Sequence, residues 1–196
     1  GAPQGLGVVR HVRAEIEIRN KTSYLPAPQL LSKFEIMTRV LFVCLGNICR
    51  SPTAEGVFRR ALAKRELENR VHVDSAGTAR WHVGSPPDDR AAAAAALRGI
   101  DLGGLRGRQV ARKDMATFDF ILAMDRENYA ALLELSEPAY AHKIQLFLEY
   151  AADRPEEEVP DPYYGGAGGF DRVIDLIEEA AEGLLDHIER QWQAQR

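Results

Sequence analysis

Cysteine is nearly absent from this sequence, whose 196 residues include only Cys44 and Cys49. Two cysteines are too few for the disulfide framework of a small secreted protein and too few for a zinc ribbon. Such scarcity is typical of proteins in a reducing compartment, so we expect a cytoplasmic location.

Long apolar runs and a strong charge of one sign are missing too. No apolar stretch approaches the roughly 20 residues that a membrane-spanning helix needs, and no charged-then-apolar opening indicates secretion. The formal net charge is only -4, which argues against nucleic acid or an anionic membrane as a partner. The share of hydrophobic residues, 45%, is ordinary for a globular domain. We therefore expect neither nucleic acid nor a membrane as a partner. We also expect a monomer.

The beginning of the chain differs from the rest. The first residue is not methionine, and Met37 directly precedes the first strongly apolar segment. The sequence thus predicts one domain over residues 37–196, with residues 1–36 as an N-terminal extension or a sequence added to the protein. Within that extension, residues 14–19 alternate like an exposed strand, and the proline-containing residues 25–31 resemble a linker.

Short apolar runs alternate with helical patterns from residue 39 onward. Strands are predicted at 39–44, 71–75, 118–124 and 144–148. Helices are predicted from Pro52, over 91–97, over 126–135 and from Gly168. This alternation predicts an α/β fold: a single three-layer domain with a four-stranded parallel sheet and helices on both faces. Active sites in such sheets lie at the carboxyl ends of the strands, and the first predicted strand ends at Cys44.

The segment between this strand and the first helix has the composition of an anion-binding loop. Its backbone N–H groups and the helix N-terminus can cradle a phosphate, and the same field favours a nucleophilic thiolate at Cys44. Arg50 offers a planar fork for two phosphate oxygens, and Ser51 can donate to the sulfur. A lone cysteine at a strand end is usually a small buried hydrophobe, but here the whole segment fits the chemistry. The predicted phosphate-binding residues are Leu45, Gly46, Asn47, Ile48, Cys49, Arg50 and Ser51, of which Gly46 and Asn47 tolerate positive φ.

Residues 43–52 resemble the phosphate loop of low-molecular-weight protein tyrosine phosphatases, bacterial members above all. Further segments resemble that family in the expected order, so the resemblance covers residues 37–196. These segments are 74–78, 81–84, 108–110, 123–125 and 159–165. The resemblance implies a phosphoric monoester hydrolase that acts on phosphotyrosine in proteins.

The family's mechanism implies roles for three residues. Cys44 attacks phosphorus, Arg50 clamps the phosphate, and Asp161 protonates the leaving phenolate and later activates water. An aspartate before proline is by itself a common turn residue, so the role of Asp161 depends on the Cys44 loop. We expect no metal and no cofactor, because the loop and Arg50 already balance the phosphate charge.

The resemblance also implies supporting roles around the loop. Asn47, Ser51 and Ser75 would hold its conformation, and Cys49 would form a reversible disulfide with Cys44 under oxidation, unless it is a buried spectator thiol. The walls of the substrate cleft would be Trp81, Tyr163 and Tyr164.

One position departs from the family pattern. Many members carry a histidine that supports the loop asparagine, and this sequence has Leu105 there. We therefore expect Asn47 to have one partner fewer. Asp89, which stands where a proline is common, should matter less.

Four other functions share parts of this pattern. Thioredoxin-coupled arsenate reductases need cysteines outside the loop, and this chain has none. Arginine-phosphate phosphatases of the family carry threonine at the place of Ile48, whose apolar side chain suits an aryl ester better. A phosphate-loop binding or regulatory module, or a phosphoryl carrier, would not need Cys44, Arg50 and Asp161 together.

Overall fold

A computed structural model describes residues 37–152, 154–163 and 168–195. The chain divides at residue 36, and every described residue belongs to the second unit, 36–196. The expectations for residues 14–19 and 25–31, and the placement of Tyr164, lie outside the described residues.

A parallel sheet of four strands forms the centre of this unit. The strands are β1 (Thr38–Cys44), β2 (Val71–Gly77), β3 (Phe120–Ala123) and β4 (Ile144–Leu146), and they lie in the order β2-β1-β3-β4. All pairs are parallel. Residues 40–43 of β1 are fully buried, as expected for an apolar strand covered on both faces. The predicted fold class is confirmed.

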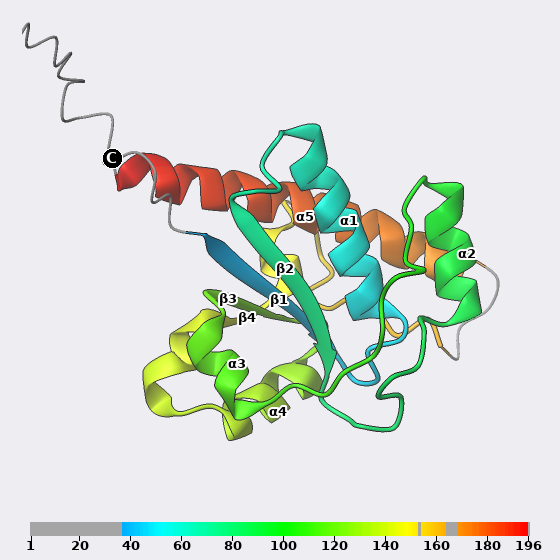
Figure 1. Cartoon of the computed structure of the whole chain (residues 1–196), viewed down its shortest axis with the longest axis horizontal. Helices are drawn as coiled ribbons and strands as arrows, with labels where there is room; N and C mark the ends of the chain where they lie inside the picture. Colours follow the sequence, from blue (N-terminus) through cyan, green and yellow to red (C-terminus); the bar gives the residue numbers. More distant parts are fainter. Residues whose placement is uncertain (1–36, 153, 164–167, 196) are drawn as a thin grey trace, which may run out of the picture. The chain divides into compact units, whose positions relative to one another are not determined.

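Helices cover both faces of the sheet (Figure 1). One side carries α1 (Arg50–Lys64), α2 (Asp89–Leu97) and the long α5 (Gly169–Ala194). The other side carries α3 (Arg112–Thr117) and α4 (Arg126–Leu135). Each side encloses its own hydrophobic cluster. No helix among the described residues is long and apolar enough to cross a membrane.

Two predicted strands are shorter in the structure than the sequence suggested. The third begins at Phe120, because α3 continues to Thr117 and Phe118 is its C-cap. The fourth ends at Leu146, because the chain turns into a 3-10 helix, η4 (Phe147–Tyr150). Another 3-10 helix, η3 (Pro138–Lys143), precedes β4.

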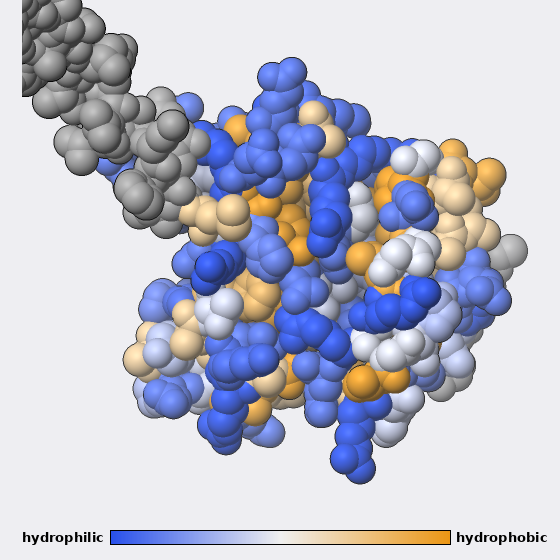
Figure 2. All heavy atoms as spheres, viewed as in Figure 1, coloured by the Kyte–Doolittle hydropathy of each residue, from blue (hydrophilic) through white to orange (hydrophobic). Residues whose placement is uncertain are grey.

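The surface seen from the side of Figure 1 is mostly hydrophilic, and hydrophobic residues gather over α2 (Figure 2). That helix is built on a run of alanines from Ala91 to Ala96, of which some are exposed. It begins earlier than expected, at Asp89, because the Asp88 side chain accepts a hydrogen bond from the Arg90 N–H and caps it.

Candidate active site

The loop between β1 and α1 holds Asn47 in a left-handed conformation, with φ of 54°. Asparagine is one of the few residue types that adopt this region readily. Gly46, whose residue type also tolerates a positive φ, does not adopt one. It is limited by space instead, because a β-carbon there would lie 3.1 Å from Cδ2 of His82.

Cys44 lies at the carboxyl end of β1 and is almost fully buried. The backbone N–H of Asn47 donates to its Sγ at 3.2 Å, and the Oγ of Ser51 lies 3.0 Å from the same sulfur. Ser51 Oγ accepts from Asn47 Nδ2 at 2.9 Å, and its own hydrogen can be donated to the sulfur or to the carbonyl oxygen of Ala76 at 3.3 Å. Both contacts stabilise negative charge on the sulfur.

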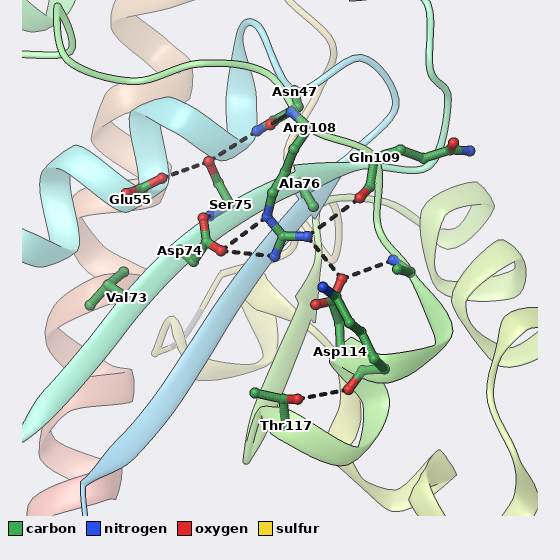
Figure 3. Close-up of polar contacts among 12 residues, drawn as sticks. Asn47, Glu55, Val73, Asp74, Ser75, Ala76, Arg108, Gln109, Asp114 and Thr117 are labelled. Atoms are coloured by element: carbon green, nitrogen blue, oxygen red, sulfur yellow. Dashed lines mark hydrogen bonds and ion pairs between the residues drawn. The ribbon is translucent and has the colours of Figure 1, made fainter. Parts of the chain in front are cut away.

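A chain of buried hydrogen bonds supports the loop from behind (Figure 3). Asn47 Nδ2 donates to Ser75 Oγ at 2.9 Å, and the Ser75 hydroxyl donates to Glu55 Oε2 at 2.7 Å. Burial raises the pKa of Glu55, while the hydrogen bond from Ser75 and the charge of Arg59 act in the opposite direction. Glu55 is the last group in this series of hydrogen bonds. Because it accepts the hydrogen of the Ser75 hydroxyl, the Ser75 oxygen is left to accept from Asn47.

The remaining group of the Asn47 amide, its Oδ1, accepts a hydrogen bond from the backbone N–H of Arg108 at 2.9 Å. The amide therefore has partners on both its nitrogen and its oxygen. Both N–H groups of the amide and one acceptor site of its oxygen are thus filled without a histidine, and the expectation that Leu105 leaves Asn47 with one partner fewer stays a prediction. Leu105 instead packs, partly buried, against the hydrophobic cluster beneath α1 and α5.

Arg108 is itself fixed by two carboxylates, which sequence reasoning missed. Its guanidinium forms ion pairs with Asp74 at 2.8 Å and with Asp114 at 2.9 Å, as Figure 3 shows. Asp114 also accepts from the N–H of Ala111 at the start of α3. The side chain of Arg108 is therefore anchored to β2 and to α3, while its backbone N–H holds Asn47.

Arg50 opens α1 and is buried, with 3% of its surface exposed. Its Nη1 donates to Asp125 and, at 3.1 Å, to the carbonyl oxygen of Val159. Its Nη2 lies 3.4 Å from Oδ2 of Asp161. Asp125, which also caps α4, was not predicted as a site residue. Its place directly after β3 was the available signal, because β1 and β3 end at the same edge of the sheet.

Asp161 is more open than the rest of the site, with 40% of its side chain exposed. Its Oδ1 accepts from the backbone N–H of Tyr163 at 3.0 Å. The segment that carries it is joined to the sheet by Val159, whose N–H donates to the carbonyl of Met124. In this way residues far apart in sequence meet beside the loop.

These groups surround a cleft of about 160 Å³. Trp81 and Tyr163 both line the cleft and are exposed at 73% and 39%. His82, to which the sequence analysis gave no role, also lines the cleft. Ser75 does not line it, in keeping with a supporting position. The lining residues are Cys44, Leu45, Gly46, Ile48, Cys49, Arg50, Trp81, His82, Asp161 and Tyr163.

Cys49 borders the same cleft but has a different environment from Cys44. Burial, the nearby Asp88 carboxylate and Cys44 raise its pKa to about 12. Both cysteines are free thiols in the structure. At neutral pH Cys49 is therefore protonated and a weak nucleophile.

Within the described parts of the chain, no three His, Cys, Asp or Glu side chains are grouped so that they could hold a metal ion. Arg50 and Asp161 supply charge at the cleft. A single buried guanidinium, the loop N–H groups and two carboxylates make up the site, an arrangement suited to binding and transferring a phosphoryl group.

Comparisons with known proteins agree with this geometry. Residues 39–194 match the family described as low molecular weight phosphotyrosine protein phosphatase. The chain is 43% identical over 157 residues to the low molecular weight protein-tyrosine-phosphatase YfkJ of Bacillus subtilis, covering 80% of this chain and 99% of that protein.

Two solved structures extend the comparison to the fold. The crystal structure of a protein tyrosine phosphatase from Entamoeba histolytica superposes with a TM-score of 0.76 at 41% identity, over 79% of this chain and 98% of that one. The structure of a Drosophila arginine phosphatase gives a TM-score of 0.72 at 36% identity, over 78% of this chain and 98% of that one.

Proposed function

The chain belongs to the low molecular weight phosphotyrosine protein phosphatase family, and we propose that it hydrolyses phosphotyrosine in proteins through a phosphocysteine intermediate. The observation that carries this proposal is that Cys44, Arg50 and Asp161 line one cleft. A thiolate, a phosphate clamp and a carboxyl acid at one site are what this reaction requires.

In the first step the Cys44 thiolate attacks phosphorus, and the bond from phosphorus to the phenolic oxygen breaks. The proton of the Asp161 carboxyl passes to that oxygen, so that tyrosine leaves neutral. In the second step water attacks the phosphocysteine while the Asp161 carboxylate takes a proton from it. Inorganic phosphate leaves, and Cys44 returns as a thiolate that Ser51 stabilises at 3.0 Å.

Arg50 would bind two oxygens of the transferred group with its planar fork. Asp125 and the carbonyl of Val159 both accept from its Nη1, which fixes the plane of the guanidinium before the substrate arrives. Such preorganised charge needs no rearrangement during the reaction. Loop N–H groups of residues 45–51 would hold the remaining oxygens.

Preference for an aryl ester is supported by the residues at the mouth of the cleft. Trp81 and Tyr163 can flank a phenyl ring, and Ile48 offers an apolar contact. Phosphoarginine is the second candidate substrate, favoured by the similarity to the Drosophila arginine phosphatase. A cationic guanidinium next to Ile48 would lose hydration without gaining a polar partner.

A panel of phosphotyrosine, phosphoserine and phosphoarginine peptides tests the proposal. We expect kcat/KM to be highest for phosphotyrosine, and Cys44→Ser to abolish turnover of every peptide. A higher value for phosphoarginine would contradict the proposed substrate. Turnover by the serine variant would contradict the proposed mechanism.

The proposed setting is the cytoplasm, where the two free thiols would stay reduced. We further propose that the protein acts as a monomer on phosphotyrosine-bearing proteins.

A further inference from the structure

Arg90, in the first turn of α2, reaches across to the segment that carries Asp161. Its Nη1 donates to the carbonyl oxygen of Tyr163 at 3.1 Å. Its guanidinium carbon also lies 5.1 Å from the ring centre of Tyr163 and 5.0 Å from that of Phe170. These distances are within the range of cation–π contacts. One side chain thus contacts both the main chain and the ring of the residue that forms a wall of the cleft.

The orientation of Arg90 is fixed from the other side by Asp88. Arg90 Nε donates to Oδ1 of Asp88 at 3.0 Å, and Nη2 donates to Oδ2 at 2.9 Å. This is the two-point geometry that restricts a guanidinium to one plane. Hydrogen bonds from Arg90 also hold the pKa of Asp88 below its usual range. The carboxylate therefore stays charged at neutral pH and keeps its hold on Arg90.

Asp88 in turn is attached to the phosphate loop. Its backbone N–H donates to the carbonyl oxygen of Ile48 at 2.8 Å. A continuous set of contacts thus runs from the loop, through Asp88 and Arg90, to Tyr163. Tyr163 then donates its N–H to Asp161 at 3.0 Å, so the set ends on the carboxyl group itself.

We propose that Arg90 is a positioning residue that sets the place of Asp161 relative to the phosphate loop. This inference rests on the proposed function, because it concerns the acid of that reaction. Asp161 has a side chain that is 40% exposed and a contact with Arg50 at 3.4 Å. Arg50 lines the cleft and must bind phosphate during the reaction, whereas Arg90 is not among the residues that line it. The link through Arg90 therefore persists when substrate occupies the cleft.

Loss of this link should impair proton transfer more than phosphate binding. A displacement of about 1 Å can cost on the order of 10²-fold in rate when a catalytic group is moved out of line. Protonation matters most when the leaving oxygen is a poor leaving group. In Arg90→Ala we expect kcat/KM to fall about 10-fold for phenyl phosphate and less than about 2-fold for p-nitrophenyl phosphate. The inhibition constant of inorganic phosphate should stay unchanged.

A series of aryl phosphates with graded leaving groups provides the test. The matched control is Arg112→Ala, because Arg112 also donates one Nη1 hydrogen bond to an exposed carbonyl, that of Leu135, at 3.1 Å. Arg90→Lys, which keeps the charge but not the two-point grip of Asp88, should show a smaller loss with the same dependence on leaving group. It also serves as the test variant if Arg90→Ala does not fold.

Asp161→Ala in the same series separates failure of this inference from failure of the proposed function. If Asp161→Ala loses activity equally for all leaving groups, the assignment of the acid itself is wrong. If Asp161→Ala shows the dependence on leaving group and the Arg90 variants do not, the role of Arg90 is wrong. The role is also wrong if the Arg90 variants weaken inhibition by phosphate as much as they lower kcat/KM. Adding Arg90→Ala to Asp161→Ala should cost no further activity, because both act through one group. An additive loss would overturn the proposal.

Discussion

Asn47 adopts a left-handed conformation that its side chain must hold in place. Its amide nitrogen donates to Ser51 and Ser75, and its oxygen accepts from the main chain of Arg108. A strained backbone conformation of this kind persists only where contacts with the surrounding residues hold it in place. Here a hydroxyl pair and one backbone N–H perform that task, so no histidine is needed at the place of Leu105.

The first prediction concerns this support. Ser75→Ala removes a partner from both Asn47 and the buried Glu55, so we expect a loss of about 1–3 kcal/mol in the free energy of unfolding. Weaker phosphate inhibition should accompany it. Denaturant unfolding and inhibition kinetics measure the two effects. The control is Ser136→Ala, which removes an exposed hydroxyl bonded only to a neighbouring carbonyl.

Leu105→His is the second prediction. Because the Asn47 amide already has its partners, we expect no gain in turnover or in phosphate binding. Removing a partly buried apolar side chain should instead lower the melting temperature. A clear rise in kcat from this substitution would show that the loop lacks support after all.

Cys49 gives a third prediction, on redox chemistry. Peroxide should convert the Cys44 thiolate to a sulfenic acid, and the Cys49 thiolate should then displace hydroxide from it to form a disulfide. Oxidation removes the charge of Cys44, but burial, the largest cause of the raised pKa of Cys49, and the Asp88 carboxylate remain, so Cys49 stays mostly protonated at pH 7. Closure should therefore be slow and should speed up about tenfold per pH unit below that pKa.

A brief peroxide pulse ended by catalase allows formation of the Cys44–Cys49 disulfide to be followed without further oxidation by peroxide. Mass spectrometry then reports the sulfenic acid and the linked peptides over time at several pH values. Cys49→Ser should retain the sulfenic acid or be oxidised further. Closure at a rate independent of pH, or no link between the two cysteines, would reject the idea.

Spacing alone could predict only the site residues of the loop, whereas Asp161, Trp81 and Tyr163, which also line the cleft, were predicted through the family resemblance. Cys44, Arg50 and Ser51 lie within one strand-to-helix turn, so local pattern suffices to place them beside a common anion. Asp125, Arg90 and the main chain of Arg108 come from three other segments. Their contacts depend on tertiary placement, and a main-chain hydrogen bond such as that of Arg108 leaves no signature in residue type.

At the scale of elements, α5 packs closely against η4. A β-carbon at Gly183 would lie 1.9 Å from the carbonyl oxygen of Tyr150. The conflicting atom belongs to the backbone, so a change of side-chain rotamer cannot make room for the β-carbon. Alanine is favoured over glycine by about 1 kcal/mol in a helix interior, and here the steric conflict opposes this gain.

Gly183→Ala is therefore the fourth prediction. We expect a net loss of about 1–3 kcal/mol in the free energy of unfolding, measured by denaturant titration. Gly104→Ala is the control, because nothing lies within 4 Å of a β-carbon there. It should change stability by less than about 0.5 kcal/mol. If both variants are equally stable, α5 does not approach η4 as closely as the structure has it.

Elements were predictable where their patterns are long. The apolar β1 and the strongly periodic α5 were identified from sequence with boundaries close to those observed. The six residues of α3 escaped notice, because a single turn or two of helix carries too little periodicity. The ends of β3 and β4 were misplaced because Phe118 and Phe147 are apolar residues that pack in the core without continuing a strand.

At the scale of the whole molecule, the parallel sheet explains why the site lies where it does. The carboxyl ends of β1 and β3 bring Cys44 and Asp125 to one edge, and Val159 joins the segment of Asp161 to that edge. Arg50 and the loop N–H groups can balance the charge of a phosphate without a metal ion. Activity should therefore persist in the presence of a chelator.

The proposed reaction passes through a phosphoryl group carried by Cys44, and acid-quenched turnover tests this step most directly. Wild-type protein and Ser51→Ala would be mixed with p-nitrophenyl phosphate, quenched, digested and examined by mass spectrometry. We predict phosphate on Cys44 alone, with more of it in Ser51→Ala, because that variant lacks the hydroxyl that stabilises the departing thiolate at 3.0 Å. Phosphate on another residue, or undiminished hydrolysis by Cys44→Ser, would contradict the account.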